Sequence, residues 1–109
     1  MITAELRIQT LPGKRQEAID ILKSLQESLK LKHDCAACKI YETYGEENSI
    51  LYREHWRTRE ALTRHIRSDL YRRILTVMEL SEISPQITFE EQGETQGMEL
   101  IVAVREGTH

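Results

Sequence analysis

The most informative part of the sequence is EHWRTREALTRHIRSDLYRRIL, residues 54–75. It opens on the end of an apolar segment, Ser49 to Trp56, that is typical of a strand. Thr58 can accept hydrogen bonds from the first free amides of a short helix. Ser68 or Asp69 can cap a further helix in the same way. The first of these helices carries Ala61, Leu62, His65 and Ile66. It follows directly after the strand end that contains Glu54 and Trp56, so local geometry brings a carboxylate, an aromatic ring and an imidazole close together.

The segments before this stretch predict a strand, a helix and the first half of a hairpin. Apolar and polar residues alternate from Ile2 to Ile8, and this period of two indicates a strand with one buried face. From Lys14 onward the spacing changes to steps of three and four, which predicts an amphipathic helix of about five turns. Lys39 to Tyr44 is then a strand that turns at residues 45–48. The apolar residues of the helix are Ala18, Leu22, Leu25 and Leu29, with Ile21 beside them.

The segments after it predict two more strands. The second helix runs to Ser84-Pro85, and Ile87 and Phe89 alternate with polar residues in a fourth strand. A polar loop, Glu91 to Gly97, leads to a last strand from Met98 to Val104. The first six elements match the split βαβ, ferredoxin-like plan. We therefore predict an α+β fold, with one antiparallel sheet and helices on a single face.

The last predicted strand also suggests an oligomer. Its residues from Leu100 to Val104 are all apolar, and a strand of this kind should not be left as a bare edge. Burial against a second subunit is the simplest solution, so we expect a homodimer that forms through the sheet.

Composition sets further bounds. A chain of 109 residues is expected to be one domain, residues 1–109, with a real core. The formal net charge is -3 and the pI about 5.8, so no basic face dominates and nucleic acid is not an expected partner. The apolar runs are short, which argues against a membrane segment or leader. We expect a cytoplasmic protein whose two cysteines are reduced.

Three short patterns carry a family resemblance. They are Tyr52-x-Glu54-x-Trp56, then Ala61-Leu62-x-x-His65, then Ser68-x-x-Tyr71. In order and spacing they resemble the antibiotic biosynthesis monooxygenase (ABM) family of dimeric α+β barrel proteins. The resemblance extends from the first strand to about Phe89. Cys35 also stands where the family often has a Gly-Cys pair.

The resemblance implies a pocket between the sheet and the short helices. Enzymes of this family oxidise an electron-rich small aromatic, such as a quinol or anthrone, with O₂ and without metal or flavin. This chemistry needs a base, a dry pocket and donors for the developing charge. The resemblance favours His65 as the base and Trp56 as a wall beside the substrate. Glu54 either orients the imidazole or fixes a substrate hydroxyl. Further substrate contacts are expected from the tyrosines Tyr52, Tyr71 and Tyr41.

The haem-degrading branch of the family does not fit this chain. Its characteristic Asn, Trp and haem-ligating His fall near Leu6, His65 and Leu75, and none of the three is kept. Haem is therefore not an expected ligand.

Other functions remain open at this point. His65 and Glu54 could be a satisfied polar pair inside the core, in a domain that binds a small apolar ligand without turning it over. An open cavity with both groups on its wall would favour a ligand site. The pattern Cys35-x-x-Cys38 invites a redox or metal function, but three extended steps separate the Cα atoms by about 10 Å, too far for a disulfide without a turn. With His33 the cysteines offer only three zinc ligands.

Overall fold

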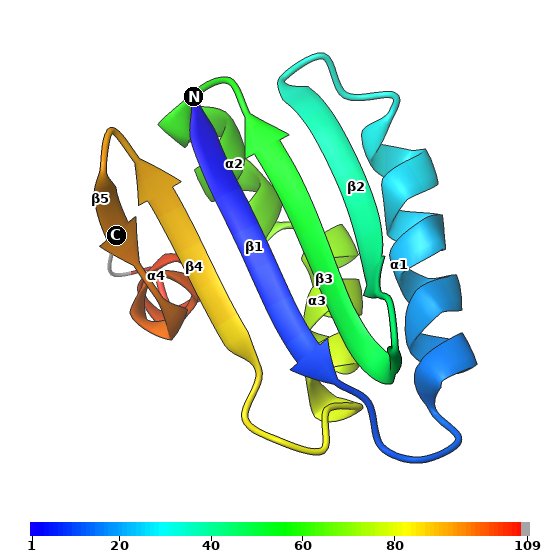
Figure 1. Ribbon diagram of the computed structural model, residues 1–109. Coiled ribbons are helices and arrows are strands. Elements are labelled where there is room, and N and C mark those ends of the chain that lie inside the picture. Colours follow the sequence, from blue (N-terminus) through cyan, green and yellow to red (C-terminus); the bar gives the residue numbers. More distant parts are fainter. Residues whose placement is uncertain (108–109) are drawn as a thin grey trace.

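The computed structural model describes residues 1–107 and contains one antiparallel sheet of five strands, in the order β2-β3-β1-β4-β5 (Figure 1). Strand β1 lies at the centre, between β3 and β4. This is the predicted ferredoxin-like α+β arrangement, with one short strand added at the edge. The strands are β1 (Ile2–Gln9), β2 (Cys35–Thr43), β3 (Glu46–Trp56), β4 (Gln86–Glu91) and β5 (Glu94–Gln96).

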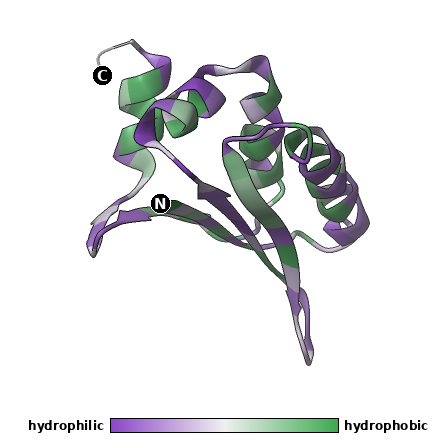
Figure 2. Cartoon of the chain, turned by 90° about the horizontal axis from the view of Figure 1, so that it is seen from above, coloured by the Kyte–Doolittle hydropathy of each residue, from purple (hydrophilic) through white to green (hydrophobic). Residues whose placement is uncertain are grey.

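All helices lie on the same side of the sheet, and the opposite sheet face is uncovered (Figure 2). The two predicted caps are confirmed: the Thr58 hydroxyl accepts from the amide of Ala61, and the Ser68 hydroxyl accepts from the amide of Tyr71. No helix within residues 1–107 is long and apolar enough to cross a membrane. The helices are α1 (Arg15–Leu29), α2 (Arg59–Arg67), the 3₁₀ turn η1 (Asp69–Tyr71), α3 (Arg72–Glu79) and α4 (Met98–Arg105).

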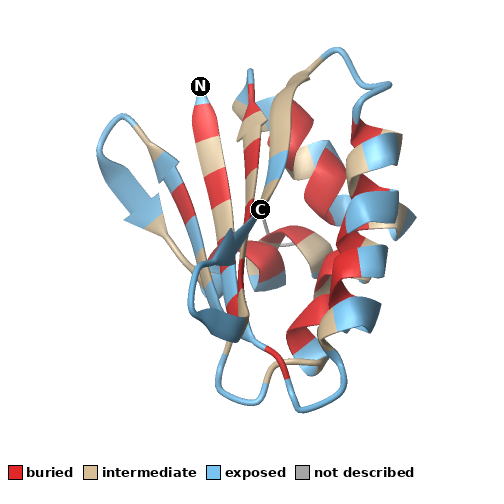
Figure 3. Ribbon diagram, turned by 45° about the vertical axis from the view of Figure 1, so that its right-hand side comes forward, coloured by how far each residue is buried: buried red, intermediate tan, exposed pale blue. Residues whose placement is uncertain are grey.

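The core lies between the sheet and the helices (Figure 3). Every second residue is buried along β1 and along β3 from Ile50 onward, as the period of two predicts. Helix α1 presents its predicted stripe to this layer, except that Ile19 is buried and Ile21 only partly so. The inward residues of β3 are Ile50, Tyr52, Glu54 and Trp56, so a carboxylate is placed inside an apolar core.

Strand β2 begins at Cys35, four residues earlier than the sequence pattern indicates. A β-bulge lies between Cys35 and Ala37. An extra residue at a bulge shifts the alternation of faces by one position. The period of two is therefore lost at this end of β2, which explains why the strand is not visible in the sequence there.

The last element differs from its prediction. Residues 98–104 were expected to form a strand but belong to helix α4, and the expected loop contains the short strand β5. The buried residues of α4 are Leu100, Ile101 and Val104, a helical spacing, whereas Val102 is 44% exposed. A short continuous apolar run does not distinguish a strand from a buried helix. The run is covered within the chain by α4 packing on α2, so the bare-edge argument for a dimer is lost.

Candidate functional site

The centre of the site is the carboxylate of Glu54, near the end of β3. Glu54 is 1% exposed, and its side chain accepts hydrogen bonds from three side chains. Tyr52 Oη lies 2.5 Å from Oε2, and Trp56 Nε1 lies 2.9 Å from Oε1. His65 Nε2, from helix α2, lies 3.2 Å from the carboxylate. Residues two apart in a strand share a face, so β3 itself supplies two of the three donors.

The surroundings of Glu54 keep it ionised. Burial alone would raise its pKa, but the positive charge that His65 carries when protonated and the hydrogen bonds from His65, Tyr52 and Trp56 outweigh burial and lower the pKa below its ordinary value. Burial and the neighbouring Glu54 charge raise the pKa of Tyr52, so its hydroxyl stays protonated and donates. The core therefore contains a carboxylate whose charge is stabilised by three directed donors.

One ring nitrogen of His65 is hydrogen-bonded to Glu54, and the other has no hydrogen-bond partner among residues 1–107. A carboxylate ion can only accept, so in the neutral imidazole the proton is assigned to Nε2, which faces Glu54. The lone pair is then on Nδ1, and this atom is buried without any hydrogen-bond partner among residues 1–107. The ring stacks on Trp56 with a centroid distance of 4.6 Å and meets the edge of Tyr71 at 5.0 Å. The ring is thus fixed by its neighbours while a basic atom remains unsatisfied.

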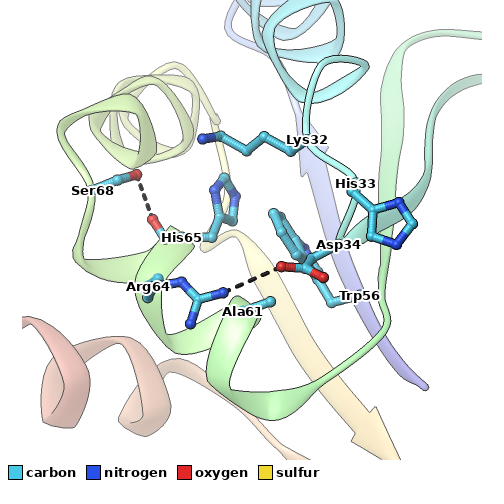
Figure 4. A pocket seen from close by; sticks show the side chains of 8 residues that line it. All are labelled: Lys32, His33, Asp34, Trp56, Ala61, Arg64, His65 and Ser68. Atoms are coloured by element: carbon cyan, nitrogen blue, oxygen red, sulfur yellow. Dashed lines mark hydrogen bonds and ion pairs between the residues drawn. The ribbon is translucent and has the colours of Figure 1, made fainter.

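A cavity of about 220 Å³ lies beside this ring (Figure 4). His65 and Trp56 both line it, with Ala61 and Ser68 from the helical side. The rim comes from the loop between α1 and β2 and from Arg64 of α2. Arg64 Nη2 lies 3.2 Å from Asp34 Oδ2, which ties this loop to the helix. The loop residues on the wall are Lys32, His33 and Asp34.

The structure brings only part of the predicted set to this cavity. Trp56 and His65 are on its wall, whereas Glu54 lies behind them and does not line it. Glu54, Tyr52 and Tyr71 instead surround a void of about 10 Å³, and both tyrosines are only 2% exposed. The prediction that tyrosines contact a substrate therefore lacks support from this cavity.

Tyr41 lies apart from the other predicted residues. It pairs with Leu51, whose neighbours Ile50 and Tyr52 face the core, so Tyr41 is on the outer sheet face. Its ring is 40% exposed and lies under the guanidinium of Arg53, at 5.3 Å. The structure does not bring Tyr41 to the cavity.

Sequence reasoning missed the rim of the cavity. Arg64, Lys32 and Asp34 were not among the predicted site residues. The contact between Asp34 and Arg64 joins residues that are 30 apart in the chain. Such a contact cannot be inferred from the periodicity of either segment. The polar sequence Lys32-His33-Asp34 directly after a helix was the one available signal, because binding residues are often found on loops.

One of the two cysteines, Cys38, belongs to the same network. The Cys38 thiol donates to Tyr52 Oη over 3.1 Å. The bulge places Cys35 opposite Trp56 and Cys38 opposite Glu54, two steps apart on β3. At the rise of a strand this corresponds to about 7 Å between Cα atoms, less than the 10 Å of an unbroken strand. Both thiols are free, and burial raises the pKa of Cys35 to about 11 and that of Cys38 to about 12.

A metal function gains no support from the geometry. Within residues 1–107 no group of three or more His, Cys, Asp or Glu side chains is placed to hold a metal ion. The three ligands considered above, His33 and the two cysteines, are not brought together. The elevated pKa values also leave the thiols protonated at neutral pH, whereas a metal ligand or nucleophile must be a thiolate.

Comparisons with known proteins agree with this fold. The family model described as antibiotic biosynthesis monooxygenase matches residues 1–76. An uncharacterized protein of Synechocystis is 31% identical over 64 residues, which is 59% of this chain and 44% of that protein. The chain thus spans less than half the length of this relative.

Solved structures show the same architecture. A conserved protein from Methanosarcina mazei is 25% identical with a TM-score of 0.74, covering 83% of this chain and 90% of the other. A crystal structure of an antibiotic biosynthesis monooxygenase is 14% identical with a TM-score of 0.73, covering 84% and 97%. At this identity the likeness concerns the fold alone.

Proposed function

Because the chain belongs to the antibiotic biosynthesis monooxygenase family, we propose that it is a monooxygenase that oxidises a small aromatic or quinol with O₂ and without a cofactor. The proposal places the substrate in the cavity of about 220 Å³ beside Trp56 and His65. The observation that carries it is the buried Nδ1 of His65, which has no partner among residues 1–107. Leaving such an atom unpaired costs about 1–3 kcal/mol, so a group that completes the site is expected.

In this proposal His65 is the general base. A substrate hydroxyl that enters the cavity meets the lone pair of Nδ1, and the proton moves to this atom. The resulting imidazolium lies 3.2 Å from the Glu54 carboxylate, which stabilises its charge. Glu54 does not touch the substrate and acts as a positioning residue, because it fixes the ring orientation and the tautomer. This division of roles corresponds to the carboxylate and imidazole of hydrolase triads.

The remaining steps belong to the substrate and oxygen. The substrate anion passes one electron to O₂, and the resulting radical and superoxide combine at a ring carbon to form a peroxide. The O–O bond then breaks, one oxygen stays on carbon, and the other leaves as water with the protons released by the substrate. For a simple hydroquinone the balance is hydroquinone plus O₂ giving hydroxyquinone plus water. Trp56 provides a flat, apolar wall for the ring and helps to exclude water.

A second function is favoured by one observation, the position of Glu54. It meets His65 inside a filled core rather than on the cavity wall, as a purely structural pair would. In that case the cavity binds a small aromatic ligand without turning it over. The two functions predict the same binding and differ in oxygen consumption.

We also propose that the protein acts as a homodimer in the cytoplasm. The uncovered sheet face carries the partly exposed Leu51 and Tyr41, which a second sheet could cover. The free thiols of Cys35 and Cys38 are the form that a reducing compartment maintains. Size-exclusion chromatography with light scattering tests the dimer, and a monomer at micromolar concentration would remove it.

The test of the catalytic proposal is oxygen uptake with a panel of hydroquinones, in the presence of a metal chelator. Wild-type protein should consume O₂ in equal amount to the product formed. The rate of His65→Gln should be lower by about a hundredfold or more, because about a hundredfold is the lower end of general-base effects. His55→Gln is the matched control, because His55 lies on the outer sheet face, 3.1 Å from Thr3 Oγ1. Equal rates for wild type and His65→Gln would reject His65 as the base. Binding without oxygen uptake would favour the second function.

A further inference from the structure

The size of the cavity limits the part of a ligand that it can enclose. Ligand pockets for drug-sized molecules have volumes of about 300–1,000 Å³, whereas a cavity of about 150 Å³ already holds benzene. The cavity beside His65 has about 220 Å³. This volume suits one aromatic ring with small substituents, and it is small for a system of three or four fused rings. The stacked rings of Trp56 and His65 provide the flat surface along which such a ring can lie.

The charge at the cavity rim has a definite sign. Arg64 is paired with Asp34 at 3.2 Å, so these two charges offset each other. Lys32 is the remaining Lys, Arg, Asp or Glu side chain on the wall, and no hydrogen bond or ion pair of its ammonium group exists within residues 1–107. Figure 4 shows Lys32 extending from its loop across the opening, on the side of His65 and Ser68. A protein with a formal net charge of -3 thus presents an unpaired cation at the mouth of its cavity.

We propose that the cavity takes a single-ring phenol or hydroquinone that carries an anionic substituent, and that Lys32 is the residue that selects for this substituent. The inference rests on the proposed function only for the presence of a ring hydroxyl beside His65. The ring lies against Trp56, and the anionic group points outward to the ammonium of Lys32. The Glu54 charge does not oppose this arrangement, because three donors already surround it behind the cavity wall.

The expected effect is modest because Lys32 is exposed. Ion pairs in contact with solvent are weak, and the loss of one corresponds to about a two- to fivefold weaker affinity. The Lys32 charge also attracts anionic ligands from a distance, and dissolved salt screens this attraction. The preference for the anionic ligand should therefore shrink as the ionic strength rises.

The test is a calorimetric titration under nitrogen with two matched probes, 2,5-dihydroxybenzoate and the neutral 2,5-dihydroxybenzamide. Wild-type protein should bind the benzoate more tightly. Lys32→Met, which keeps the apolar stem, should weaken the benzoate about two- to fivefold and leave the benzamide unchanged. Lys23→Met is the control, because Lys23 is exposed on α1 and does not line the cavity.

Three results would overturn the inference: equal affinities of the two probes for wild type, an equal loss of both in Lys32→Met, or no loss of either. Because oxygen is absent, the titration does not depend on turnover. If the benzoate preference holds and depends on Lys32 but no oxygen is consumed in air, the monooxygenase proposal fails and the ligand class stands. If oxygen uptake depends on His65 but not on the charge of the ligand or on Lys32, the ligand class fails and the monooxygenase proposal stands.

Discussion

Replacing Tyr52 by phenylalanine removes one oxygen atom from the centre of the buried network. The Tyr52 hydroxyl donates to Glu54 over 2.5 Å and accepts from the Cys38 thiol over 3.1 Å. Phenylalanine keeps the ring and its packing in a side chain that is 2% exposed. The substitution therefore tests the contribution of these hydrogen bonds to stability and creates almost no cavity in the core.

The size of the effect follows from the charge of Glu54. Hydrogen bonds to charged groups contribute about 1.5–3 kcal/mol, against about 0.5–1.5 kcal/mol for neutral pairs. The free energy of unfolding should thus fall by about 1.5–3 kcal/mol at pH 7. The pKa of Glu54 is lowered in the folded protein, so its charge stabilises the fold above the unfolded value of about 4.3, and this contribution is lost as the pH falls through the folded pKa. In Tyr52→Phe the pKa is less depressed, so the difference from wild type should shrink in acid.

The assay is urea denaturation followed by the fluorescence of Trp56, the single tryptophan, from pH 7 down to the lowest pH at which both proteins unfold cooperatively. Tyr44→Phe is the matched control, because Tyr44 is fully exposed, and it should change stability by less than about 0.5 kcal/mol. A difference in stability between Tyr52→Phe and wild type that is the same at every pH would contradict this prediction, since the lost bond would then not be one to a charged carboxylate.

Two further predictions concern the thiols and the last helix. Cys35 and Cys38 should react with a thiol reagent at pH 8 at least about a hundredfold more slowly in the folded protein than in urea. The reason is that burial raises their pKa values to about 11 and about 12, from an unfolded value of about 8.5. Equal reaction rates in the folded and unfolded protein would contradict this prediction. Their contribution to stability should be lost as the pH rises above about 8.5, which urea denaturation at pH 7 and pH 10 measures. In helix α4, Ile101→Ala should cost about 2–4 kcal/mol and Val102→Glu less than about 0.5 kcal/mol, because Ile101 is buried and Val102 exposed; the reverse order would fit the alternating faces of a strand.

Much of the fold could be predicted from the sequence because its periodicities are clear. The period of two in β1 and β3 and the apolar stripe of α1 are each visible, and Thr58 and Ser68 mark the helix starts by their hydrogen-bonding side chains. The end of the chain could not be predicted in this way. Its β-branched residues favour a strand, whereas packing against α2 selects a helix, and tertiary contacts override such local preference.

The site was predictable only as far as local geometry reaches. Glu54, Trp56 and His65 are brought together by one strand end and the helix that follows it, and the sequence contains that information. The cavity rim depends on Asp34 meeting Arg64, a contact between distant segments that no local pattern encodes. Tyr41 was expected beside the ligand because it is aromatic, but the register of β2 on β3 places it on the other face.

The protonation of the two ring nitrogens of His65 decides whether this residue can act as a base. Long-range ¹H–¹⁵N NMR of uniformly labelled protein distinguishes a protonated from an unprotonated ring nitrogen, and His65→Gln assigns the signals. We predict a proton on Nε2 and none on Nδ1 in the neutral ring, and the Nδ1 signal should shift when 2,5-dihydroxybenzoate is added without oxygen. A proton on Nδ1, or an Nδ1 signal that no aromatic ligand perturbs, would contradict the claim that Glu54 leaves this nitrogen free to act as a base.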